Sequence, residues 1–114
     1  MHELGTVFYV IEQVEKVCKE NELTKVGSVT LEIGEVSGII PMYIQDCWEW
    51  AKKRSEVMKD AELKIETLEA VTYCVDCQKT YSTMKYKKIC PHCGSENTYL
   101  LTGNEYNIKE IEAM

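Results

Sequence analysis

Apolar residues recur at helical spacing near the start of the chain. From Thr6 onward, apolar side chains come at steps of three and four residues, while charged and amide side chains occupy the opposite face. The apolar positions are Val7, Val10, Ile11, Val14, Val17 and Cys18. The pattern predicts an amphipathic helix that starts after a Thr6 N-cap and ends near Asn21.

A strand pattern and a second helix pattern come next. Between Ser28 and Glu35, apolar residues alternate with polar residues and glycine, which predicts a half-buried strand. A second helical period starts at Pro41, a residue that suits the first helical turn, and runs to about Arg54. Its predicted buried positions are Ile44, Cys47, Trp48 and Ala51. We expect Trp48 in the core and Trp50 at its rim.

The pattern in the rest of the chain predicts strands before and after a cysteine-rich segment. Leu63 and Ile65 alternate with charged residues and predict a strand that leads into this segment. After it, strand-like patterns over 97–101 and 106–108 flank a turn at Gly103 and Asn104. The chain therefore leaves a sheet, passes through the cysteine-rich segment and returns to a sheet.

Four cysteines in two Cys-x-x-Cys pairs define this segment. Cys74 and Cys77 form the first pair, and Cys90 and Cys93 form the second. Two such pairs at this separation are typical of a structural zinc site, in which each pair lies on a tight turn and directs two sulfur atoms at one tetrahedral ion. Because four thiolates close the coordination shell, this metal is expected to hold the fold and to catalyse nothing.

Other uses of the cysteines fit less well. An iron–sulfur cluster is less favoured because the spacing lacks the clustered third cysteine of ferredoxins. A thioredoxin-like dithiol needs a βαβ context, which Cys74 and Cys77 lack, and disulfides need an oxidising compartment, for which the N-terminus shows no secretory signal. Cys18 and Cys47 lie in predicted helices and are expected to be buried, reduced thiols. No apolar run approaches the ~20 residues of a membrane span. We therefore expect a soluble, cytoplasmic protein with no membrane partner.

The charge distribution bears on a second hypothesis, a zinc ribbon that binds nucleic acid. The net charge of the chain is −6. Four lysines and Asp76 give the stretch between Cys74 and Cys93 a local charge of +3, so the remainder carries −6 − 3 = −9. The binding residues in this hypothesis are Lys79, Lys85, Lys87 and Lys88, with Tyr81 and Tyr86 for stacking. The acidic remainder would repel phosphate, which makes nucleic acid the less favoured partner.

Together these patterns predict an α+β fold. We expect a small mixed sheet with two helices on one face, plus an inserted zinc-ribbon subdomain. The predicted domains are residues 1–72 with 99–114, and the zinc ribbon over 73–98. The ribbon is too short to bury a core of its own, so its folding should depend on metal. The sequence offers no phosphate loop, nucleophile elbow or open three-ligand metal site that would indicate an enzyme.

The N-terminus, Met1-His2-Glu3, offers a second kind of metal chemistry. A histidine at position two lets a short peptide present the α-amine, the His2 amide nitrogen and the imidazole through five- and six-membered chelate rings. Displacing an amide proton favours ions that gain from square-planar nitrogen coordination, namely Ni(II) or Cu(II). Glu3 could supply a fourth donor. The null hypothesis is an ordinary terminal tail with no metal.

Three motifs together resemble a known family. Met1-His2-Glu3, the run Ile33-Gly34-Glu35-Val36-Ser37-Gly38-Ile39-Ile40-Pro41 and the two late Cys-x-x-Cys pairs are similar to the hydrogenase nickel-incorporation family (HypA/HybF). The resemblance extends over essentially the whole chain, with the motifs in the same order. Two departures stand out: Gly5 replaces a small hydroxyl residue, and His92 lies inside the second cysteine pair, where we expect only a solvated side chain.

The resemblance implies a nickel metallochaperone and not an enzyme. Such a protein would deliver Ni(II) to the precursor of the large subunit of a nickel–iron hydrogenase, together with a hydrogenase-maturation GTPase. The implied nickel ligands are Met1, His2 and Glu3, and the implied zinc ligands are Cys74, Cys77, Cys90 and Cys93. The sequence does not separate a monomer from a homodimer, and it does not name the recipient hydrogenase.

Overall fold

The computed structural model describes residues 3–114, with only the backbone of Glu3, and divides into two compact units. The first unit takes in the chain up to Glu32, then Ile39–Glu66 and Asn107–Met114. The second unit consists of Ile33–Gly38 and Thr67–Tyr106. Within residues 3–114, none of the helices has the length and hydropathy of a membrane span.

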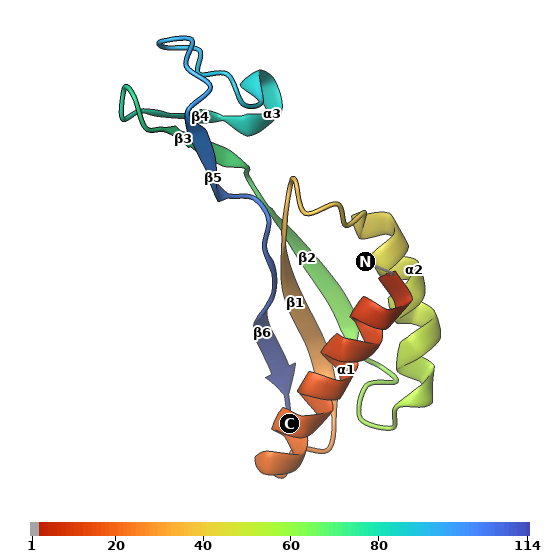
Figure 1. The fold of residues 1–114 in the computed structure, drawn as a ribbon. Helices are drawn as coiled ribbons and strands as arrows, with labels where there is room; N and C mark the ends of the chain where they lie inside the picture. The colour runs from red at the N-terminus through yellow and green to blue at the C-terminus, as the bar shows by residue number, and fades with distance from the viewer. Residues whose placement is uncertain (1–2) are drawn as a thin grey trace. The chain divides into compact units, whose positions relative to one another are not determined.

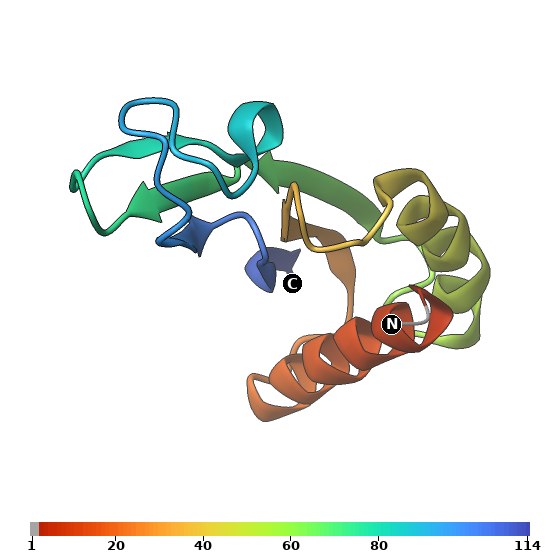
Figure 2. The same ribbon diagram turned by 45° about the horizontal axis from the view of Figure 1, so that its top comes forward.

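Two helices cover one face of a three-stranded sheet in the first unit. The helices are α1 (Glu3–Glu20) and α2 (Pro41–Ala51), which a short 3-10 helix, η1 (Lys52–Arg54), extends. The strands are β1 (Val26–Gly34), β2 (Glu62–Leu68) and β6 (Tyr106–Ala113), in the order β2-β1-β6. Both ribbon views place α1 and α2 side by side on the same face (Figures 1 and 2). The predicted α+β architecture is confirmed.

The sheet is mixed because its two connections differ. Helix α2 returns the chain between β1 and β2, so these strands run in the same direction (Figure 1). At the far end of β6, Met114 and Lys25 exchange both backbone hydrogen bonds, with N–O distances of 2.8 and 3.0 Å. Such a reciprocal pair is the antiparallel pattern, so β6 runs opposite to β1.

The core of the first unit follows the predicted stripes, with exceptions at Val17 and Cys47. Its buried residues include Val7, Val10, Ile11, Val14 and Cys18 on α1, and Ile44, Trp48 and Ala51 on α2. Trp48 is fully buried and Trp50 is 49% exposed, as predicted. Val17 is 38% exposed, because the line of buried positions in α1 continues through Val14 to Cys18 and leaves Val17 at its margin.

The prediction that Thr6 caps the first helix is wrong. Helix α1 already begins at Glu3, so Thr6 lies inside the helix, where it is 4% exposed. No proline interrupts the residues before Thr6, and Gly5 is accommodated within the helix with open space around its Cα. The helix therefore gains almost one turn relative to the sequence pattern.

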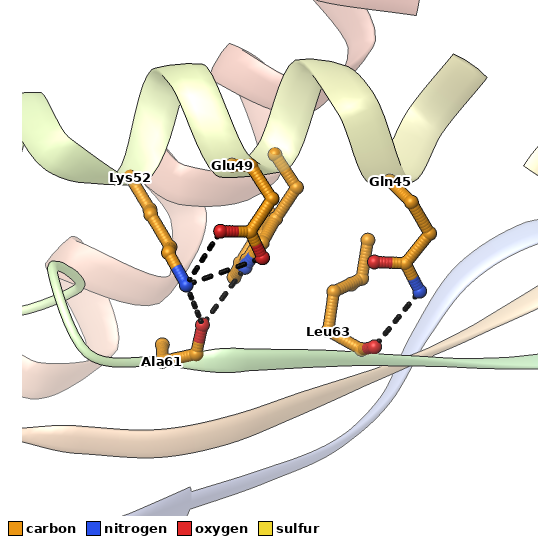
Figure 3. Close-up of polar contacts among 6 residues, drawn as sticks. Gln45, Glu49, Lys52, Ala61 and Leu63 are labelled. Atoms are coloured by element: carbon orange, nitrogen blue, oxygen red, sulfur yellow. Dashed lines mark hydrogen bonds and ion pairs between the residues drawn. The ribbon is translucent and has the colours of Figure 1, made fainter. Parts of the chain in front are cut away.

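Polar contacts hold α2 to the start of β2. The Gln45 side chain donates a hydrogen bond from Nε2 to the carbonyl oxygen of Leu63 at 2.9 Å, and Lys52 Nζ donates to the carbonyl oxygen of Ala61 at 3.3 Å (Figure 3). Lys52 also pairs with Glu49. From the core side, Trp48 Nε1 donates to the same Ala61 oxygen at 3.0 Å. These bonds satisfy buried polar atoms and fix the position of α2 along β2.

Across the sheet, the Glu112 carboxylate joins all three strands. It accepts hydrogen bonds from Ser28 Oγ at 2.5 Å and from Lys64 Nζ at 3.2 Å. The Ser28 hydroxyl, followed by Lys64, holds the pKa of Glu112 below its ordinary value.

This carboxylate predicts a pH dependence of stability. A pKa lowered by folding contributes stability above the unfolded value, and the contribution is lost as the pH falls through the folded value. We therefore expect the Glu112→Gln substitution to flatten the loss of thermal stability on acidification below about pH 4.5. Thermal unfolding followed by circular dichroism from neutral to acid pH measures this, with the exposed Glu22→Gln variant as control. An unchanged acid slope would contradict the prediction.

The second unit is a small antiparallel sheet with one helical turn. Its elements are β3 (Val71–Cys74), β4 (Thr80–Ser82), α3 (Thr83–Tyr86) and β5 (Thr98–Thr102). The strand order is β4-β3-β5. In the register, Thr72 lies opposite Tyr81 on β4, and Tyr73 lies opposite Tyr99 on β5. Cys74 ends β3, Cys77 follows it before β4, and Cys90 and Cys93 lie between α3 and β5.

The second unit extends beyond the predicted ribbon of residues 73–98. The segment 33–38 joins it through backbone bonds from Glu35 to the Leu68 oxygen (2.9 Å) and from Val36 to the Gly103 oxygen (2.8 Å). The Glu35 carboxylate also accepts the Ala70 amide at 2.6 Å. A Cβ on Gly34 would overlap the Gly103 backbone, so the motif glycine permits a close approach of two chain segments.

Candidate metal centres

The structure brings the four predicted zinc ligands together. The sulfur atoms of Cys74, Cys77, Cys90 and Cys93 all lie within 4.8 Å of one another. The pairs Cys74–Cys93 and Cys77–Cys90 are each 3.6 Å apart, and all four cysteines are free. A tetrahedral ion with zinc–sulfur bonds of about 2.3 Å separates its sulfur ligands by about 3.8 Å. The donor set therefore fits one tetrahedral, thiophilic metal ion.

Each cysteine pair lies on the same type of turn. In the first turn, the amide of Gln78 donates to the Cys74 oxygen at 2.9 Å. In the second, the amide of Gly94 donates to the Cys90 oxygen at 2.8 Å. The residue after each pair has positive φ, 59° at Gln78 and 74° at Gly94. This repeat turns each backbone sharply, so that both sulfur atoms of a pair point to the same centre.

Backbone amides and the neighbouring sulfur atoms set the thiol chemistry. Burial raises the pKa of Cys90, but the amides of His92 and Cys93 outweigh burial and lower it to about 7. The His92 amide lies 3.4 Å from the Cys90 sulfur. At Cys93 the Ser95 amide lowers the pKa, but burial and the neighbouring sulfur atoms outweigh it and raise the value to about 12. Four sulfur atoms this close favour a cation that replaces their protons.

A hydrogen-bonded cluster that the sequence analysis missed joins the two turns. Ser95 Oγ and Asn97 Nδ2, from beyond the second pair, donate to the carboxylate of Asp76, which lies inside the first pair. Asn97 also donates from its backbone to Ser95 Oγ at 3.0 Å. The Ser95 bond, followed by the Asn97 bond, lowers the pKa of Asp76. The acidic residue between Cys74 and Cys77 was the available signal, but its partners are distant in sequence.

One of the two tyrosines predicted to stack on nucleic-acid bases is buried in the structure. Tyr81 is only 7% exposed, and its hydroxyl donates to the Lys87 carbonyl oxygen at 2.8 Å. It therefore packs among the cysteines and presents no free face for base stacking. Tyr86 remains exposed, at 47%. His92 is also exposed, and its backbone amide contributes to the site.

The two remaining cysteines lie outside this site. Cys18 is buried in α1, and burial, with the Glu15 carboxylate, raises the pKa of its thiol. Cys47 lies on α2 and is half-buried, less than predicted. Both sulfur atoms are free thiols.

The predicted nickel ligands lie almost entirely outside the residues that the structure describes. Met1 and His2 are outside the described residues, and of Glu3 only the backbone is described. The backbone of Glu3 forms the first described residue of α1, so the last of the three predicted nickel ligands belongs to this helix.

Fold and site together define a class: a small α+β protein whose second unit is a metal-binding ribbon with four cysteines. A family model described as "Hydrogenase/urease nickel incorporation, metallochaperone, hypA" matches residues 1–113. The chain belongs to the HypA family. This family is described as one of metallochaperones, which are carriers and not enzymes.

Relatives and a solved structure match over nearly their whole length. The chain is 34% identical over 111 residues to a protein of Actinobacillus succinogenes named hydrogenase maturation factor HypA, covering 97% of both chains. It is 35% identical over 112 residues to the protein of the same name from Geobacter metallireducens, covering 98% of both. The solution structure of the nickel metallochaperone HypA from Helicobacter pylori is similar at a TM-score of 0.75 and 29% identity, covering 100% of this chain and 98% of that one.

Proposed function

We propose that this chain is a nickel carrier for the maturation of nickel–iron hydrogenase. The observation that carries the proposal is the family match over residues 1–113, which includes the Met1-His2-Glu3 tripeptide. Relatives matched over nearly their full length are named hydrogenase maturation factors, and a solved structure of similar fold is named a nickel metallochaperone.

The nickel ligands in this proposal are the Met1 α-amine, the amide and imidazole nitrogens of His2, and Glu3. Nitrogen donors in fused chelate rings favour Ni(II) over oxygen-preferring ions such as magnesium and calcium. The α-amine and imidazole release their protons near about pH 8 and 6.5, so nickel affinity should fall as the pH drops through this range. A chelate built at the chain terminus can be taken apart one ligand at a time, which suits a carrier.

The metal at Cys74, Cys77, Cys90 and Cys93 in this proposal is zinc. The four thiolates form the donor set of structural zinc sites, and sulfur atoms within 4.8 Å of one another suit tetrahedral coordination. Zinc would neutralise thiolate charge and hold both turns together. It would have no role as a Lewis acid, because the four sulfur ligands leave no position for a substrate.

Partners and location follow from the same role. The carrier would meet a hydrogenase-maturation GTPase and the precursor of the hydrogenase large subunit, both of them proteins and not nucleic acids. Metal-binding thiolates require a reducing compartment, which supports a cytoplasmic location.

A short N-terminal extension tests the nickel site. Extending the chain by four residues before Met1 takes the terminal amine out of reach of the His2 chelate rings, so we expect the tight nickel site to be lost while one zinc per chain remains. Calorimetry with Ni(II) and elemental analysis of zinc measure the two outcomes. The substitution His2→Ala is a second test, because it removes the imidazole ligand. The chain has two histidines, so His92→Ala, which removes the other imidazole, is the matched control.

The two variants separate the terminal site from other nickel sites. We expect His2→Ala to behave like the extended chain and His92→Ala to bind nickel like the native protein. Equal nickel binding by the native and extended chains would reject the terminal chelate and, with it, the proposed carrier function.

A further inference from the structure

The second unit carries a cleft that has no part in either metal site. The cleft has a volume of about 520 Å³, within the roughly 300–1,000 Å³ typical of ligand sites. Its apolar lining includes Val36, Tyr99 and Leu100, while Lys87 and Lys88 supply positive charge and Glu96 a single carboxylate. Such a cleft can receive a ligand that is both apolar and negatively charged.

Hydrogen bonds hold the backbone of both lysines, and their ammonium groups form no ion pair with the described residues. Tyr81 donates to the Lys87 carbonyl oxygen at 2.8 Å, and Thr98 donates to the Lys88 carbonyl oxygen at 2.9 Å. Lys87 has a φ of 58°, a backbone conformation rare for residues other than glycine. Within residues 3–114, neither ammonium group forms an ion pair, whereas Lys64 and Lys109 in the first unit pair with Glu112 and Glu66. The cleft therefore presents two exposed cations that form no ion pair in the described part of the chain, with the Glu96 carboxylate as the single opposite charge in its lining.

Strand β5, which supplies Tyr99 and Leu100, is also an edge strand. It pairs with β3 on one side and ends the sheet order β4-β3-β5. Its sequence contains no charge or proline, and Tyr99, Leu100 and Leu101 are 53%, 38% and 47% exposed. The edge strands of the other sheet, β2 and β6, both carry lysine and glutamate residues. Proteins usually protect edges with charges, so an uncharged, apolar edge is suited to pairing with another strand.

We propose that this cleft binds an extended acidic segment of a partner protein. The segment would pair with the edge of β5 and project alternate side chains to opposite faces of the sheet. Its carboxylates would lie on the face of Leu100 and Thr98, near Lys87 and Lys88, and its apolar side chains would lie on the face of Tyr99. This inference goes beyond nickel carriage and does not depend on the terminal chelate. A free anion would use the lysines but not the apolar wall or the strand edge.

The probe is an acetylated peptide of alternating glutamate and valine, long enough to lie along β5. Heteronuclear NMR on the full-length, zinc-loaded chain follows its binding. We expect peptide-induced shifts confined to residues 87–88 and 98–102. A glutamate–serine peptide should bind more weakly because it lacks the apolar side chains, and a lysine–valine peptide should not bind because it repels the lysines.

Matched variants separate the cleft from the general charge of the unit. Lys87→Gln and Lys88→Gln should each weaken binding of the glutamate–valine peptide about fivefold, the upper range for one exposed ion pair. Lys79→Gln and Lys85→Gln remove the same charge from the same unit but lie outside the cleft, so their affinity should match that of the native protein. Fluorescence anisotropy at about 0.15 M ionic strength, where distant charges are screened, measures the affinities.

Four results would overturn the proposal. Equal weakening by all four lysine variants would show diffuse attraction, and competition by inorganic phosphate at equal concentration would show a simple anion site. Equal binding of the lysine–valine peptide would show strand pairing without charge recognition. Absence of shifts in the cleft would show that no such peptide binds there. Each outcome is independent of nickel binding, so failure here leaves the proposed carrier function intact.

Discussion

Removing the metal from the four-cysteine site is expected to unfold the second unit locally while leaving the first unit folded. The buried cluster at this site consists of Cys74, Tyr81 and Cys90, with Cys77 packed against it. Two of its three buried members are thus metal ligands in the proposed zinc site. Without metal, the sulfur atoms must regain protons and the apolar contribution of Tyr81 alone remains.

The magnitude of this effect is large because metal binding and folding are coupled in small ribbons. Structural zinc contributes about 10–16 kcal/mol of apparent binding free energy in zinc-finger peptides. Few apolar side chains are buried in the three short strands of this unit, so their burial cannot replace that contribution. The helices and sheet of the first unit have their own core around Trp48 and Leu31.

Hydrogen exchange before and after chelation tests this expectation. Amides of β3 and β5 should exchange near the unfolded rate once the metal is removed, while those of α1 and β1 keep their protection. Cys90→Ser should reproduce the effect in part, whereas Cys47→Ser, outside the site, should not. Retained protection in β3 after complete metal removal would show that the ribbon folds without metal.

Replacing Trp48 with alanine is expected to destabilise the first unit by about 3–5 kcal/mol. The Trp48 side chain is fully buried, and its Nε1 donates to the Ala61 carbonyl oxygen at 3.0 Å. The substitution leaves a cavity and removes this bond between α2 and the start of β2. Since folded domains are stable by only about 5–15 kcal/mol, the loss would be a large share of the total.

Two further variants identify the origin of the loss. Trp48→Phe keeps most of the buried area and loses the hydrogen bond, so we expect a smaller cost of about 1–2 kcal/mol. Trp50 is 49% exposed and stacks on the Arg54 guanidinium at 3.9 Å, so Trp50→Ala should cost about 1 kcal/mol or less. Urea unfolding followed by far-UV circular dichroism measures all three. Equal costs for Trp48→Ala and Trp50→Ala would contradict the assigned core.

Much of the first unit could be predicted because its pattern is local. Helical spacing placed Val7, Val10 and Val14 on one face of α1, and alternation placed Leu31 inside β1. The prediction failed where several positions were sterically acceptable. Thr6 is a good cap residue, yet α1 continues past it to Glu3, since the preceding residues also tolerate helix.

In the candidate sites too, local features could be predicted from the sequence and features that depend on distant residues could not. The spacing of the cysteines indicated one metal centre, because two residues between cysteines place both sulfur atoms on one turn. The burial of Tyr81 among the cysteines could not be predicted, since it depends on β4 pairing with β3 in the register that sets Thr72 opposite Tyr81. The cleft beside β5 was equally hidden, because its lining comes from segments distant in the chain.

The sequence by itself determined the α+β composition, the cysteine ligand set and the inward face of α2, because each depends on spacing within a short segment. Only the tertiary structure decided that segment 33–38 belongs with the ribbon and that Asp76 meets Ser95 and Asn97. The close approach of Gly34 to Gly103 is of the same kind. These features depend on contacts between residues that are distant in the sequence, and local periodicity does not predict such contacts.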